Sequence, residues 1–127
     1  MKSRAKGSST KKQASSQNAR SALSVRQPFA ELILRGIKKI EYRSIPTHKR
    51  ERVYIYAGKV PRDDPSSWAQ VKLQPGDLPT GVLVGTVEIV GCVGEPGDYQ
   101  WKLARPRRLK PPIKPKRMPQ PVFFLPF

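Results

Sequence analysis

The alternation of apolar and polar residues predicts a small, mostly antiparallel β-barrel. Strand-like alternation begins at 22–25 and returns at 39–43 and 52–57, where apolar side chains occupy every second position. The longest β-branched run, 82–90, predicts a further strand, and Gly85 within it indicates a bulge or a barrel corner. These four segments account for most of the expected sheet.

The spacing of apolar residues changes to a helical period between the first two strands. Phe29, Leu32 and Ile33 follow Pro28, a residue that helices tolerate best in their first turn, and Gly36 supplies the stop. The pattern predicts one principal helix of two to three turns, near residues 28–35.

Three shorter segments complete the expected elements. Asp64 and Pro65 predict a short capped helix that runs to about Leu73. Residues 98–103 suggest a single helical turn that returns Tyr99 and Trp101 to the core. The segment 122–125 is too apolar to hang free and is expected to join the sheet.

Composition divides the chain into four parts. Residues 1–20 hold six basic and no acidic residues, lack large apolar side chains after Met1, and are expected to be a disordered arm. The folded domain covers 21–103, an extended segment rich in Pro, Arg and Lys covers 104–121, and 122–127 completes the barrel. Most of the net charge of +16 lies in the flanks, because eight more basic residues and no acid follow Trp101.

Two acid-free basic flanks suit a polyanion, and nucleic acid is the usual one because cations neutralise its phosphates and release counterions. RNA is the expected partner, DNA remains open, and a solubilising tail is the alternative. The residues expected to contact phosphate are Lys39, Arg107, Arg108, Lys114 and Lys116. No membrane contact is expected, since no apolar run approaches the ~18 residues of a span and seven prolines from Pro106 to Pro126 prevent an amphipathic helix.

Four charged residues around the principal helix form the candidate binding site: Arg26, Lys38, Glu41 and Arg43. Arg43 offers a planar fork for phosphate or a base edge, and Glu41 can accept from an exocyclic amine or a ribose hydroxyl. The alternative is that Glu41 only pairs with Arg26 or Arg43 and fixes the strand. Trp68, in a polar loop and helix, is the best candidate for base stacking, although such a residue also caps the core of small barrels.

The remaining chemistry-bearing residues indicate little. Cys92 lies in an apolar strand and is expected to be a buried structural thiol, and His48 is expected to be an exposed turn residue. One cysteine and one histidine leave too few soft ligands for zinc, so neither a metal nor a cofactor is expected. The N-terminus lacks the apolar region of a secretory signal, which makes the cytoplasm the expected compartment.

The stretch SALSVRQPFAELILRGIKKIEYRS, followed by RVYIYA, resembles the ASCH domain family. The resemblance covers roughly residues 21–103 and rests on Gly36-X-Lys38-X-X-Glu41-X-Arg43 joined to Ser24-X-Arg26 upstream; the end PQPVFFLPF is similar to a subgroup of bacterial ASCH proteins. It implies a PUA-like β-barrel related to RNA-binding modules, with the motif residues around a cleft between helix and barrel.

The resemblance also leaves an enzymatic alternative open. Some ASCH relatives hydrolyse the amide of acetylated cytidine with a lysine at the position of Lys38 and a threonine, the proposed nucleophile, where this chain has Glu41. Other relatives are described as metal-dependent ribonucleases, for which Glu41 with Glu88 or Asp77 would hold Mg²⁺. No catalytic residue is assigned; Lys38 and Glu41 are the candidates if there is a reaction. We therefore expect a non-catalytic RNA-binding module, with oligomeric state open.

Overall fold

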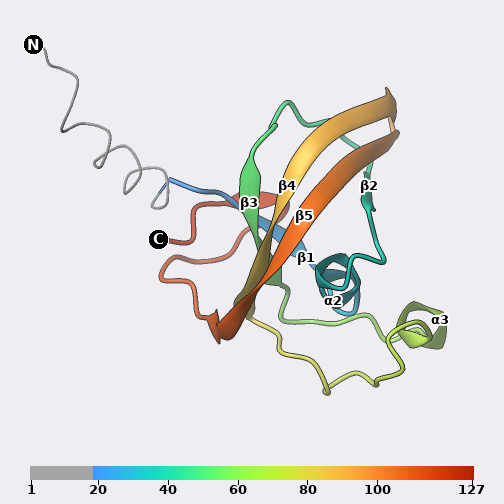
Figure 1. The fold of residues 1–127 in the computed structure, drawn as a ribbon, viewed down its shortest axis with the longest axis vertical. Helices are drawn as coiled ribbons and strands as arrows, with labels where there is room; N and C mark the ends of the chain where they lie inside the picture. The colour runs from blue at the N-terminus through green and yellow to red at the C-terminus, as the bar shows by residue number, and fades with distance from the viewer. Residues whose placement is uncertain (1–18) are drawn as a thin grey trace, which may run out of the picture.

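The computed structural model describes residues 19–127, and their main feature is one six-stranded sheet that curls into a half-barrel (Figure 1). The strands are β1 (Ala22–Val25), β2 (Ile40–Arg43), β3 (Arg52–Ala57), β4 (Val82–Glu95), β5 (Asp98–Ile113) and β6 (Phe123–Phe124). Their order is β2-β5-β4-β3-β1-β6, and β1 with β3 is the one parallel pair in this sheet. The mostly β fold expected from the sequence is confirmed.

The principal helix, α2 (Phe29–Leu34), packs against β3, β4 and β5. Its first turn is held by the buried side chain of Gln27, whose Oε1 accepts from the Glu31 backbone N–H at 3.0 Å. Gly36 ends the helix with a φ of +77°, a conformation that glycine adopts without strain. The N–H groups of Ile37 and Lys38 then both donate to the Leu32 carbonyl, so the chain turns sharply into β2.

The hairpin of β4 and β5 is longer than the sequence pattern indicates, and it dominates Figure 1. Residues 98–103 are strand, so the predicted helical turn there is wrong; Trp101 still reaches the core because it lies on the inner face of β5. β5 continues to Ile113 despite its prolines. A register shift at Gly85 confirms the bulge expected at that residue.

The core lies between α2 and the concave face of the sheet and includes Leu23, Ile33, Ile55, Val87 and Trp101, all at most 1% exposed. Removing such side chains from water is the main favourable term in folding. The second helix, α3 (Pro65–Trp68), stops well before the expected Leu73 and lies outside this core.

The C-terminal segment returns to the sheet, where β6 pairs antiparallel with β1. Phe123 stacks on Trp101 with ring centroids 5.5 Å apart, and Phe124 and Phe127 meet Tyr56 and Tyr54 edge to face. The predicted disorder of the N-terminal arm concerns residues that, apart from Ala19 and Arg20, lie outside the described chain. No helix in the described residues is long and apolar enough to cross a bilayer.

Candidate nucleic-acid interface

Three of the four charged residues expected at the site meet around one buried carboxylate. Glu41, which is 7% exposed, accepts from Arg43 Nε at 2.7 Å through Oε2 and lies 3.5 Å from Lys38 Nζ through Oε1. We call Lys38, Glu41 and Arg43 the Glu41 cluster. Because two cations share one carboxylate, the cluster keeps an excess of one positive charge.

Aromatic rings surround the Glu41 cluster. The Lys38 ammonium lies 5.3 Å from the ring centroid of Phe29 and 5.4 Å from that of Tyr42, and the Arg43 guanidinium lies 5.6 Å from Trp101. Arg43 also donates through NH2 to the Ser24 carbonyl at 2.7 Å, which joins β2 to β1. Arg43 is thus largely committed to the fold, whereas Lys38 has a single carboxylate contact.

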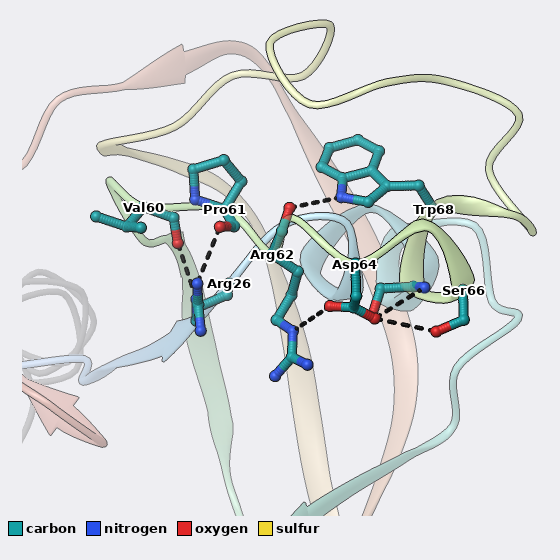
Figure 2. A network of polar contacts seen from close by, with 8 residues as sticks. Arg26, Val60, Pro61, Arg62, Asp64, Ser66 and Trp68 are labelled. Atoms are coloured by element: carbon teal, nitrogen blue, oxygen red, sulfur yellow. Dashed lines mark hydrogen bonds and ion pairs between the residues drawn. The ribbon is translucent and has the colours of Figure 1, made fainter.

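The fourth expected residue, Arg26, is engaged elsewhere. Its guanidinium donates to the carbonyls of Val60 and Pro61, both at 2.9 Å, and so fixes the loop after β3 (Figure 2). No contact between Arg26 and Glu41 is found among the described residues, and a ligand-binding role of Arg26 stays a prediction. Arg62 from the same loop lies 5.9 Å from the Phe29 ring centroid, a contact that the sequence alone did not indicate.

Trp68 is 5% exposed and packs with Leu32 and Val71 in a small apolar cluster of its own. Its Nε1–H donates to the Arg62 carbonyl at 2.7 Å, as Figure 2 shows. The burial of Trp68 fits the alternative given for it, a cap on apolar side chains, and not an open stacking ring. Tyr42, which is 59% exposed, is the open ring near the Glu41 cluster.

A hollow of about 300 Å³ lies between the C-terminal end of α2 and β5. Apolar side chains, Ile33, Val87 and Leu103, line it, while Lys38, Lys39 and Arg105 supply cations. Lys39, expected to contact phosphate, is exposed at this hollow. The volume is at the lower end of small-ligand pockets.

The arrangement at Glu41 recurs at two other carboxylates. Glu31 accepts two hydrogen bonds from Arg108, at 2.8 and 2.9 Å, and one from Arg35 at 2.8 Å. Burial acts to raise the pKa of Glu31, but the hydrogen bonds from Arg108 and Arg35 outweigh it, and the net pKa is lower than usual. Arg108, expected to hold phosphate, is therefore a structural ion-pair partner as well; the Glu31–Arg35 spacing of four residues was the one sequence signal for this site.

Glu88 is held by Arg105 at 2.8 Å and by Arg52 at 3.0 Å. The hydrogen bond from Arg105 is the largest cause that lowers the pKa of Glu88 to about 2. Like the other two, this trio carries one excess positive charge.

The second half of β5 and the segment after it carry cations without acidic partners. From Arg105 to Arg117, only Arg105 and Arg108 have an acidic side chain within 4.0 Å among the described residues. The other cations of this range are exposed and have no such partner: Arg107, Lys110, Lys114, Lys116 and Arg117.

The carboxylates considered for a metal lie in separate networks. Glu41 and Glu88 each hold two cations, and Asp77 accepts from the Gln74 backbone N–H at 2.8 Å. Within residues 19–127, no three His, Cys, Asp or Glu side chains gather closely enough to hold a metal ion.

A curled β half-barrel with a charged cluster at the end of its principal helix defines the class of domain, and the comparisons agree. The ASCH domain model matches residues 23–112, and the chain belongs to this family. Activating signal cointegrator 1 of Mus musculus and of Homo sapiens are each 37% identical over 83 residues, which is 58% of this chain and 14% of theirs. The chain thus spans only a small part of these relatives.

The crystal structure of an ASCH protein from Zymomonas mobilis matches the fold with a TM-score of 0.60 and 15% identity, covering 85% of this chain and 87% of that one. A mutant of the same protein matches with a TM-score of 0.58 and 14% identity, covering 84% and 89%. At these identities the likeness concerns the fold.

Proposed function

We propose that this ASCH domain binds single-stranded RNA without catalysis. The observation that carries the proposal is a run of five exposed cations that have no acidic partner among the described residues: Arg107, Lys110, Lys114, Lys116 and Arg117. Unpaired lysine and arginine side chains along one extended segment suit a phosphate backbone, whose neutralisation releases counterions. The net charge of +16 adds long-range attraction for such a polyanion.

The Glu41 cluster lies after the C-terminal end of α2, beside β5, and supplies polar contacts to a nucleotide. Lys38 is the member best placed for this role, because its ammonium has one carboxylate partner and two aromatic neighbours. Arg43 acts mainly by holding Glu41 and β1 in place. The threonine nucleophile of the amidohydrolase relatives is replaced by Glu41, so binding is favoured over that reaction.

The test is the salt dependence of binding to a single-stranded RNA of about ten nucleotides. A protein that neutralises about six phosphates should give a slope of log K against log salt near −4. The double variant Lys114→Gln, Lys116→Gln should weaken binding and flatten the slope by about 1.4. Substitution is preferable to deletion, because residues 104–113 belong to β5.

The matched control is Lys59→Gln, Lys72→Gln, which removes the same charge from exposed positions outside the basic run. For this control variant, the slope of log K against log salt should equal that of the wild type. Equal effects of the two double variants would show that net charge alone matters, and no binding by the wild type would overturn the proposal.

A further inference from the structure

The outer face of the β2-β5-β4 ladder carries an open ring beside an amide and a lysine. The register places Tyr42 opposite Gln100, and Gln100 opposite Val93, in one row across three strands. Tyr42 and Val93 are 59% and 48% exposed, while the intervening residues, such as Trp101, point into the core. The side chains of this row alternate with those of Glu41 and Trp101, which are buried.

A second row lies beside the first, in which Ile40, Lys102 and Gly91 are opposite one another. A Cβ placed on Gly91 would lie 3.3 Å from Lys102 Cδ, so the lysine stem lies across the glycine. The stem of Lys102 therefore runs along the face of the sheet. The Lys38 ammonium, 5.4 Å from the Tyr42 ring centroid, supplies a cation at the strand edge.

We infer that this surface, which we call the Tyr42 platform (Tyr42, Gln100, Val93 and Lys102), stacks one base of a single-stranded nucleic acid. A base needs one exposed ring for its π-face and a nearby amide for its edge, and Tyr42 and Gln100 supply both. Lys102 and Lys38 are placed to meet the adjoining phosphates. The inference rests on the proposed function but concerns residues outside the basic run.

The size and charge of the platform favour a base over a folded protein. A stable protein interface buries about 800 Å² on each partner, far more than one ring, one amide and a valine provide. The same face carries Glu95 and Asp98 at the hairpin tip, opposite each other in the register. Their charges repel phosphates and direct the backbone of the strand toward Lys102.

The test compares Tyr42→Ala and Tyr42→Phe in the full chain, with a single-stranded RNA of about ten nucleotides that carries one 2-aminopurine. Tyr42→Ala should weaken binding about tenfold and abolish the stacking-induced quenching of the 2-aminopurine, whereas Tyr42→Phe should retain both because it keeps the ring. On the same strand with an abasic site in place of the fluorescent base, Tyr42→Ala should bind like the wild type. Val60→Ala, at another exposed apolar residue, should change nothing.

Because Tyr42 is exposed, thermal unfolding of the variants should match that of the wild type, which separates lost stacking from lost fold. Equal RNA affinity of the wild type and Tyr42→Ala, with the salt dependence intact, overturns the platform and leaves the proposed function standing. Self-association that Tyr42→Ala abolishes, with RNA binding unchanged, assigns this face to a second copy instead. Absence of RNA binding by the wild type overturns both.

Discussion

Glu31, Glu41 and Glu88 each accept contacts from two cationic side chains, and Glu31 and Glu88 are held across different elements. Each shared carboxylate leaves one excess positive charge, and those of Glu31 and Glu88 also tie elements together. The domain therefore orders six cations near α2 and the sheet and neutralises only half of their charge. Such fixed cations lose less side-chain entropy when an anion binds than free lysines would.

The lowered pKa values of Glu31 and Glu88 predict a loss of stability in acid. In the unfolded chain a glutamate titrates near 4.5, whereas the folded pKa of Glu88 is about 2 and that of Glu31 is also lowered. The unfolded state thus binds more protons between these values, and the stabilising contribution, complete above about pH 5, is lost as pH falls toward 2. The melting temperature should fall over this range.

The substitution Glu88→Gln should lower the melting temperature at neutral pH and make its decline in acid shallower. Glu51→Gln is the control, because Glu51 is exposed and its nearest cation, Lys49, is 3.9 Å away. A decline in acid that is equally steep in Glu88→Gln and in the wild type would contradict this account.

At the scale of the elements, the bulge of β4 at Gly85 allows the hairpin to approach α2. A Cβ at Gly85 would overlap the Arg107 carbonyl oxygen and the Leu34 side chain. We expect Gly85→Ala to lower the free energy of unfolding by about 2 kcal/mol, measured by urea denaturation. Gly91→Ala, in the same strand, meets only the flexible side chain of Lys102 and should change it by no more than about 0.5 kcal/mol.

The elements show what the sequence could and could not predict. Local patterns identified β1, β2, β3 and α2 to within about two residues, because alternation, a proline start and a glycine stop are local signals. Local patterns failed for residues 98–103, for which a helical turn was predicted. This segment is a strand because it pairs with β2 and β4. Register is a non-local property that one segment does not encode.

The site shows the same division. Lys38, Glu41 and Arg43 were expected together because they are close in sequence and on neighbouring elements. The position of Arg26 depends on the loop carrying Val60 and Pro61, and the exposure of Tyr42 depends on what covers the β2 edge. Neither is visible in a linear pattern, so the sequence could not show that Arg26 binds the loop after β3 or that Tyr42 is exposed while Trp68 is buried.

At the scale of the whole molecule, the C-terminal segment completes a core that begins a hundred residues earlier. Phe123 stacks on Trp101 at an interplanar angle of 8° and accepts the Lys49 ammonium 5.2 Å from its ring centroid. Ser24 Oγ donates to the Gln120 carbonyl at 2.8 Å beside it. The C-terminal segment therefore covers the Trp101 ring through Phe123, and the Arg43 guanidinium also lies over this ring.

Phe123→Ala should therefore destabilise the entire sheet and not only the tail. We expect a loss of about 2–3 kcal/mol in the free energy of unfolding, because the variant leaves a space over the largest buried side chain. Leu125→Ala, two residues away and 44% exposed, is the matched control and should have little effect. If urea denaturation followed by circular dichroism gave the same midpoint for both variants, the tail would be an appendage and Trp101 would owe its burial to α2 and the sheet alone.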